Sequence, residues 1–131
     1  MNDQRANLVT LFGQNGSGNT RRLMEMEKRT TCDQVLRIGA ETLIEDIVAG
    51  ARHGLATDTL ICYRKIDNLL IDNLWVLASR PYVSRPVREL VSARRSDGLL
   101  TVLASDMTLA QWSVEQAEMA SLLASGETVQ F

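Results

Sequence analysis

The chain has 131 residues, enough for one domain with a core of its own. Its 45% apolar and 23% charged residues exclude disordered, collagen-like and low-complexity chains. A formal net charge of −2 excludes a strongly basic protein, but it averages two unlike parts. All 14 basic residues lie within residues 1–95, whereas residues 96–131 hold five acids and no base.

No stretch approaches the roughly 18 apolar residues that a membrane helix needs, and the N-terminal residues lack the apolar run of a signal peptide. We therefore expect a cytoplasmic protein that does not bind membranes.

Four side chains stand apart from any motif. Cys32 and Cys62 have no His or Cys at ligand spacing, so we expect two reduced, partly buried thiols and no metal there. Trp75 and Trp112 are expected to be packing anchors around the carboxyl edge of a sheet.

The hydrophobic period predicts strands that alternate with helices. In the first half we expect strands at 7–12 and 35–38 and helices at 19–29 and 40–52. The last of these is the clearest helix in the chain. Its apolar residues recur at i, i+3, i+4, i+7, i+8 and i+11, which is one stripe of a helix: Ala40, Leu43, Ile44, Ile47, Val48 and Ala51.

In the second half, the runs 69–71 and 99–103 are apolar on both faces, which is typical of buried parallel strands. The remaining predicted elements are a helix over 84–96, capping boxes at Thr108 and Ser113, a helix that starts at Ser113 and is closed by Gly126, and a strand over 128–131. The alternation predicts an α/β fold with a doubly wound, mainly parallel sheet.

A glycine-rich segment follows the first predicted strand. Residues 13–20 match the phosphate-binding pattern G-x-x-x-x-G-K-[ST] at every fixed position except the lysine, which is Asn19. Backbone N–H groups and a helix N-terminus can hold phosphates at such a turn, and Thr20 has the place of a magnesium ligand. The candidate nucleotide-binding residues here are Gly13, Gly16, Ser17, Gly18, Asn19 and Thr20.

Asn19 changes the strength expected of this loop. An amide can donate a hydrogen bond but carries no charge, which forfeits on the order of 1–2 kcal/mol, or about tenfold in affinity. A lysine would also neutralise charge that develops in phosphoryl transfer. Two interpretations stay open: the loop is only a well-made strand-to-helix turn, or it still binds ATP or ADP.

The next candidate residues follow the strand at 69–71. Leu69-Leu-Ile-Asp-Asn73 has the form of a Walker B strand, which ends in an acid at the carboxyl edge of the sheet. Asp72 would hold magnesium. Asn73 stands where a second acid commonly orients the attacking water.

The segments 63–74 and 99–106, together with this loop, resemble the ATPase core of the bacterial replication initiator DnaA and its regulatory relative Hda over nearly the whole chain. The resemblance implies an AAA+-like P-loop NTPase, a three-layer αβα sandwich with five strands, and ATP or ADP with Mg²⁺ as cofactor. It also implies that Ser105 and Asp106 form the sensor 1 region, which responds to the γ-phosphate. Asp72-Asn73 and the altered loop resemble the Hda branch more than a full initiator.

The departures from that family are as informative as the matches. Leu122 stands where the family has an arginine that acts on a neighbouring subunit's nucleotide. The family's lid would follow the last strand, so we expect residues 1–131 to be a single core without a lid. With Asn19 and Asn73, this predicts a pseudo-ATPase without catalytic residues: a regulatory or adaptor protein of DNA replication initiation with weak or no nucleotide binding.

Two alternatives remain: a slow ATPase completed by a partner subunit, and a nucleic-acid-binding accessory protein that uses the Arg80–Arg95 face. A DnaA-like protein of the replication-initiation machinery is the expected partner. Head-to-tail homo-oligomers through the basic and acidic parts are also conceivable.

An arginine row begins just before Pro81 and continues along the predicted helix. Its members are Arg80, Arg85, Arg88, Arg94 and Arg95. We interpret it first as a solvated face, second as a docking surface for an acidic protein through Arg85, Arg88 and Arg95, and last as a nucleic-acid contact, which lacks interleaved aromatic residues.

Overall fold

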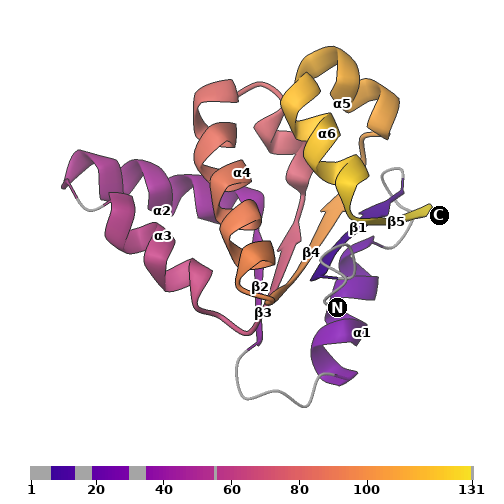
Figure 1. Ribbon diagram of the computed structural model, residues 1–131, viewed down its shortest axis with the longest axis horizontal. Coiled ribbons are helices and arrows are strands. Elements are labelled where there is room, and N and C mark those ends of the chain that lie inside the picture. Colours follow the sequence, from indigo (N-terminus) through magenta and orange to yellow (C-terminus); the bar gives the residue numbers. More distant parts are fainter. Residues whose placement is uncertain (1–6, 14–18, 30–34, 55, 131) are drawn as a thin grey trace.

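Five parallel strands form one sheet in the computed structural model, which describes residues 7–13, 19–29, 35–54 and 56–130 (Figure 1). The strand order is β2-β3-β4-β1-β5. Since all strands are parallel, their carboxyl ends meet at one edge. The strands are β1 (Leu8–Phe12), β2 (Val35–Gly39), β3 (Asn68–Asp72), β4 (Leu100–Ser105) and β5 (Glu127–Gln130).

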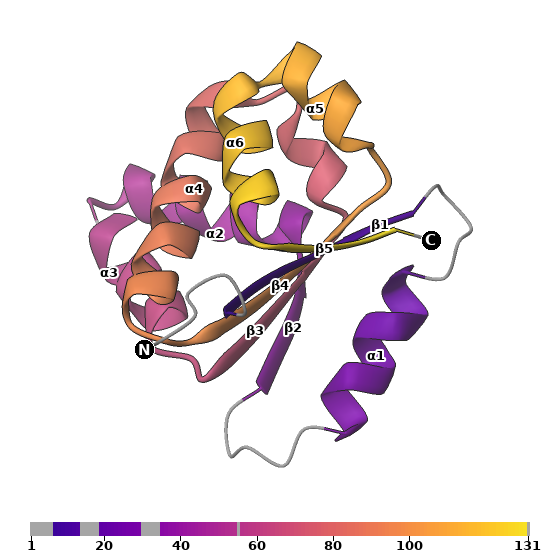
Figure 2. The same cartoon turned by 45° about the vertical axis from the view of Figure 1, so that its right-hand side comes forward.

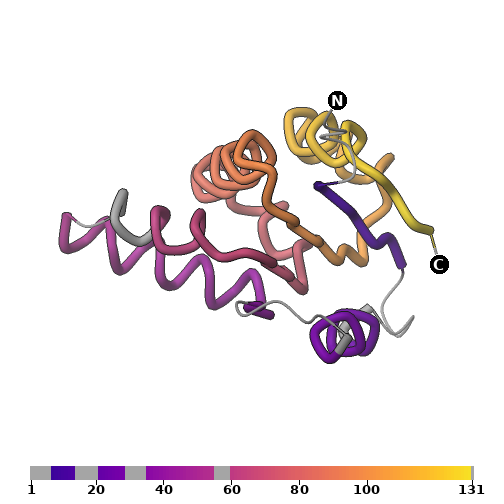
Figure 3. The backbone as a smooth tube through the Cα atoms, turned by 60° about the horizontal axis from the view of Figure 1, so that its bottom comes forward, coloured from indigo at the N-terminus to yellow at the C-terminus, as the bar shows by residue number. Residues whose placement is uncertain are grey.

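Helices cover both faces of this sheet. Figures 2 and 3 show α1 on one side of the sheet and the larger group of helices on the other. The helices are α1 (Asn19–Arg29), α2 (Ala40–Arg52), α3 (Ala56–Arg64), the 3₁₀ turn η2 (Leu74–Leu77), α4 (Pro81–Ser96), α5 (Leu109–Glu115) and α6 (Ala117–Ser125). The three-layer αβα sandwich is confirmed.

The core is accordingly in two parts. A small cluster under α1 includes Leu11, Leu23 and Leu70, and a much larger cluster lies between the sheet and the other helices. Every residue of β3 is buried, as predicted for a strand that is apolar on both faces. No helix in the described part of the chain is long and apolar enough to cross a membrane.

The predicted helices at 19–29 and 40–52 are confirmed, and the predicted strands differ from the observed ones by a few residues. The helix predicted from residue 84 begins instead at Pro81, because a proline at the first helical position gives up an N–H that has no partner there anyway. The sequence did not predict α3 or η2. Neither has an apolar stripe at helical period that is long enough to stand out.

The Thr108 capping box is confirmed: the Gln111 backbone N–H donates to Thr108 Oγ1 at 3.1 Å, and Gln111 Oε1 accepts from the Thr108 N–H at 2.7 Å. The prediction that Ser113 begins a helix is wrong. Ser113 lies inside α5, where its hydroxyl donates to the Leu109 carbonyl at 3.1 Å.

The break between α5 and α6 falls at Gln116, which has extended backbone angles. The Gln116 side chain donates to the carbonyls of Leu77 (2.6 Å) and Ala78 (3.0 Å) and accepts from the Ser84 hydroxyl (2.6 Å). These contacts join the α5–α6 corner to η2 and α4. Tertiary hydrogen bonds therefore decide where the helix breaks.

Arg94 was predicted to stand in an exposed arginine row, and this prediction is wrong because its side chain is fully buried. Its guanidinium donates to Thr101 Oγ1 (2.8 Å) and to the backbone carbonyls of Tyr63, Arg64, Ile66, Asp67 and Leu100. These acceptors come from the end of α3, the approach to β3 and the start of β4. Burial lowers the pKa of Arg94 to about 10, while the charges of Asp67 and Asp97 act in the opposite direction, so the group stays charged at neutral pH.

Replacing Arg94 should therefore destabilise the fold strongly. Arg94→Met is expected to lower the free energy of unfolding by about 3–5 kcal/mol, since several buried carbonyls lose their only cationic donor. Urea denaturation measures this loss. The matched control is Arg85→Met, on the exposed side of the same helix, which should cost less than about 1 kcal/mol; equal losses would contradict the role given to Arg94.

Replacing Thr10 is expected to stabilise the fold, in contrast to replacing Arg94. Its hydroxyl is fully buried in β1 and has no hydrogen-bond partner among the residues that the structure describes. Thr10→Val should raise the free energy of unfolding by about 1 kcal/mol, because it removes an unpaired buried polar group. Thr101→Val is the control: its hydroxyl accepts from Arg94, so that change should destabilise by about 1–3 kcal/mol. A destabilised Thr10→Val variant would show that the hydroxyl is paired in solution.

Candidate functional site

The candidate site lies at the carboxyl edge of the sheet, where β1 leads into the glycine-rich loop. The backbone N–H of Gly13 donates to the Ser105 carbonyl at 3.1 Å, which ties the start of the loop to the end of β4. Helix α1 begins at Asn19, as predicted for such a loop. Gly16, Ser17 and Gly18 lie outside the described residues, as do the side chains of Asn19 and Thr20, so their roles remain predictions.

Asp72 ends β3 in this edge and is 7% exposed. One of its carboxylate oxygens, Oδ1, accepts from the backbone N–H of Asn73 at 2.8 Å. Asn73 itself has φ 55° and ψ 42°, a left-handed conformation that asparagine adopts more readily than most residues. Asp72 is thereby fixed at the end of the strand, and the chain turns sharply away after it.

Glu41 is a site residue that sequence reasoning missed. The Asn73 side-chain amide donates to both of its carboxylate oxygens, at 3.3 and 3.5 Å. Glu41 lies in the first turn of α2, and its carboxylate folds back over Gly39, where a Cβ atom would stand 2.0 Å from Oε1. Only glycine leaves room for that position, so a glycine two residues before a glutamate at a strand-to-helix junction was the available signal.

Gly39 pairs in register with Asp72. The Glu41 carboxylate therefore lies beside the end of β3, next to the amide that stands in the place of the second Walker B acid. Position 73 therefore carries an amide in place of a carboxylate, but the Glu41 carboxylate lies within hydrogen-bond distance of that amide.

Ser105, at the end of β4, uses its whole hydrogen-bonding capacity within the fold. Its hydroxyl accepts from the Trp112 indole N–H (2.9 Å) and the Met107 N–H (3.1 Å), and donates to the Met107 carbonyl (2.9 Å). The expected sensor role of Ser105 stays a prediction, and its hydroxyl would have to leave these partners to reach a ligand.

Asp106 follows directly and is half-buried. Burial raises the pKa of the Asp106 carboxyl, and the negative charge of Asp72 raises it further. Since β3 and β4 are neighbouring parallel strands, Asp72 and Asp106 both lie at the carboxyl edge of the sheet.

These residues fit a magnesium ion only in part. No group of three His, Cys, Asp or Glu side chains in the described part of the chain could hold a metal. Magnesium in nucleotide sites commonly takes one or two carboxylates and completes its shell with phosphates and water. Asp72 and Asp106 can supply that share, and a cation between them would relieve their mutual repulsion.

The arginines predicted to bind a partner are all engaged within the chain. Arg85 pairs with Glu89 on its own helix at 3.1 Å, whereas Arg88 reaches Glu118 at 2.9 Å. Arg95 donates to the Ser125 hydroxyl at 2.6 Å. Arg88 and Arg95 thus hold α4 against α6, and their expected role toward a partner stays a prediction.

Trp112 is buried, as predicted, but Trp75 is 48% exposed and is no packing anchor. In the tight 3₁₀ turn, Leu74 and Leu77 share one face and are buried, which leaves Trp75 outward. Cys62 is an exposed free thiol rather than a partly buried one, and Cys32 lies outside the described residues.

No family model matches the chain. Among solved structures, domain III of the Thermotoga maritima replication initiation protein DnaA is similar with a TM-score of 0.88 and 23% identity, over 98% of this chain and 56% of that chain. DnaA from Aquifex aeolicus, bound to AMPPCP, is similar with a TM-score of 0.83 and 20% identity, over 96% of this chain and 40% of that chain. DnaI is similar with a TM-score of 0.72 and 16% identity, over 96% of this chain and 73% of that chain.

At these identities the likeness shows the fold. The chain spans about half, or less, of the DnaA chains that it matches.

The raised pKa of the Asp106 carboxyl predicts that the stability of the fold depends on pH. The folded-state pKa of Asp106 lies above its ordinary value of 3.8, so the folded state holds this proton where the unfolded state has lost it. As pH rises from the ordinary Asp pKa through the raised pKa of the folded state, the folded protein loses this proton and the stability that the protonated carboxyl contributed is lost. Asp106→Asn should therefore raise the urea midpoint at pH 7, and the gain should disappear near pH 3.

In the control variant, the urea midpoint should change in the opposite direction. A hydrogen bond from Arg64 lowers the pKa of Asp97, so Asp97→Asn should lower the midpoint at pH 7 and have little effect at low pH. A midpoint at pH 7 that falls in Asp106→Asn would contradict the repulsion between Asp72 and Asp106.

The resemblance to the DnaA core that residues 63–74 and 99–106 indicate is thus confirmed for the fold: the chain has a five-stranded parallel αβα architecture like that of DnaA domain III.

Proposed function

We propose that this protein is a DnaA-like P-loop protein of replication initiation that acts as a regulator or adaptor. It binds a protein partner, holds ATP or ADP weakly and hydrolyses little. The observation that carries this proposal is the amide of Asn73 in the place of the second Walker B acid, beside a retained Asp72. An amide cannot take a proton from an attacking water.

Nucleotide would bind at the sheet edge. Gly13 and the backbone from Gly16 to Thr20 would hold the phosphates, with Asp72 and Thr20 toward Mg²⁺ and Asp106 close by. Bound magnesium would neutralise charge on the phosphates. The AMPPCP bound to the similar Aquifex aeolicus DnaA supports nucleotide binding by a protein with this fold.

A slow ATPase is the second candidate, and Glu41 favours it. Its carboxylate lies within hydrogen-bond distance of the Asn73 amide, so the edge retains a potential base close to the place of the missing acid. A partner subunit would then supply the arginine for which Leu122 stands in this chain. A DnaA-like protein or a second copy of this chain would be that subunit.

Calorimetry with ATP and ADP in the presence of Mg²⁺ tests the nucleotide part. Wild type should bind weakly, and Asn19→Lys should tighten binding about tenfold by adding a charged donor. Asp72→Ala should remove the magnesium dependence. Absence of binding in both wild type and Asn19→Lys would contradict a nucleotide site and leave the loop as a structural turn.

Phosphate release in the same samples separates the two candidates. The adaptor proposal expects no release above background. Measurable release that Glu41→Gln abolishes, and that Glu45→Gln one turn further along α2 leaves unchanged, would establish the ATPase candidate instead.

A further inference from the structure

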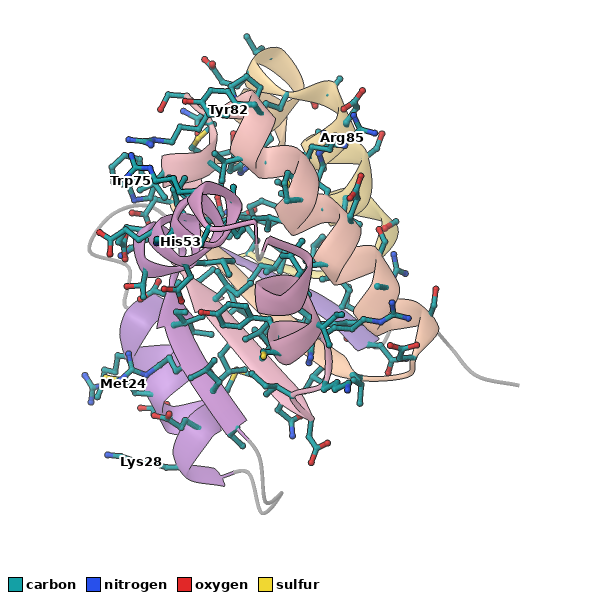
Figure 4. The ribbon with its side chains drawn as sticks, turned by 90° about the vertical axis from the view of Figure 1, so that its left-hand side faces the viewer. Met24, Lys28, His53, Trp75, Tyr82 and Arg85 are labelled. Atoms are coloured by element: carbon teal, nitrogen blue, oxygen red, sulfur yellow. The ribbon has the colours of Figure 1, made fainter. Side chains whose placement is uncertain are left out.

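One stripe of α4 faces the α2–α3 hairpin rather than the sheet. Its residues recur at i, i+4, i+7, i+11 and i+15: Tyr82, Pro86, Glu89, Ala93 and Asp97. The hairpin is held together in part by the Tyr63 hydroxyl, which donates to Asp46. Figure 4 looks onto this side of the molecule, with the hairpin in the foreground and α4 beside it.

Three hollows lie in a row along this stripe, and we call them together the α4 groove. The first, about 450 Å³, lies between α2 and α4 and is floored by Ile47, Val48, Val83 and Pro86. The second, about 270 Å³, lies between α3 and α4 over Leu60, Leu90 and Ala93. The third, about 570 Å³, lies at the end of α4 beside Lys65 and Leu99, and it shares Ile61 and Arg64 with the second.

The groove is apolar and is rimmed by exposed apolar side chains. Tyr82 is 74% exposed at its upper end, and Ile61 is 40% exposed where the second and third hollows meet. Trp75, also exposed, lies on the same side of the molecule as Tyr82 (Figure 4). Exposed large apolar side chains that gather on one side of a molecule are typical of an interaction site.

The charges of the groove define what fits it. Its two acids are already bound by arginines: Glu89 by Arg85 at 3.1 Å, and Asp97 by Arg64 at 2.8 Å. Its other two cations, Arg52 in the first hollow and Lys65 in the third, have no ion pair or side-chain hydrogen bond among the described residues. Among the described residues, the groove therefore has a cation without an ion pair at each end, Arg52 and Lys65, and an apolar floor between them.

The spacing of the hollows matches a helix. They follow α4 at intervals of about seven residues, or about 10 Å at 1.5 Å per residue, which is two turns of a helix lying alongside. Large apolar side chains at i and i+7 of such a helix would meet successive hollows, and acidic side chains near its ends would meet the two cations.

We propose that the α4 groove binds an amphipathic, acidic helix of a partner protein. The inference rests on the proposed role in binding another protein, and it does not require bound nucleotide. Arg52 and Lys65 would select the acidic partner, while Tyr82 and Ile61 would cover its apolar face.

A synthetic 18-residue helical peptide tests this directly, with leucines at i, i+3, i+7, i+10 and i+14 and glutamates on the flanks. Binding to the full chain without nucleotide is followed by fluorescence anisotropy. The acidic peptide should bind about tenfold more tightly than the same peptide with lysine in place of each glutamate. Equal binding of the two peptides, or none at millimolar concentration, would overturn the proposal.

Variants locate the binding surface. Arg52→Glu/Lys65→Glu should weaken acidic-peptide binding about tenfold, and Tyr82→Ser should weaken it as well. The controls are Arg21→Glu/Lys28→Glu, which makes the same charge change on α1, and Val114→Ser, an exposed apolar residue on α5. Equal losses in test and control variants would overturn the assignment to this groove.

Other occupants are separate outcomes. Self-association that sedimentation detects in wild type, and that Tyr82→Ser abolishes, would assign the groove to a second copy. Binding of single-stranded DNA that Arg52→Glu/Lys65→Glu abolishes would assign it to nucleic acid. Either result overturns the helix proposal. Because the peptide is measured without nucleotide, failure of the ATP experiments leaves this result intact, and the reverse also holds.

Discussion

The buried guanidinium of Arg94 is the interaction on which the arrangement of this fold depends. It gathers carbonyls from the end of α3, the approach to β3 and the start of β4. It thereby joins the amino ends of two neighbouring strands, whose pairing runs from Asn68 with Leu100 to Ile71 with Leu103. A slip of one residue between β3 and β4 would turn the side chains of one strand to the opposite faces and disrupt both core clusters.

That register also brings the candidate site together at the opposite edge. With β3 and β4 in this alignment, Asp72 and Asp106 both come at the carboxyl edge of the sheet, about 15 Å away from the Arg94 contacts at roughly 3.3 Å per residue. The cation at one end of the sheet and the carboxylate pair at the other are thus parts of one arrangement.

The secondary structure that the sequence predicted has a common physical basis. The strands at 69–71 and 99–103 and the helix at 40–52 each bury a face with a clear period, so local pattern and tertiary packing agree. The glycine loop and Asp72 were recognisable because their chemistry requires a fixed spacing. Asn73 could be identified as a departure for the same reason.

What the sequence could not predict depends on contacts between distant segments. Arg94 and Arg95 are neighbours in the chain, yet one is buried among carbonyls and the other lies at the surface. Glu41 belongs to the site only because Gly39 lets its carboxylate fold back toward Asn73, which is 32 residues away. Gln116 likewise breaks a helix through partners in η2 and α4.

In the proposed function, this core keeps a site for nucleotide but lacks the charges needed to hydrolyse the nucleotide. Single-turnover phosphate release with Mg²⁺-ATP tests this proposal, comparing wild type with Asn19→Lys/Asn73→Asp, which restores a lysine and a second acid. We expect background release from wild type and measurable release from the double variant. Equal rates, well above background in both proteins, would contradict it.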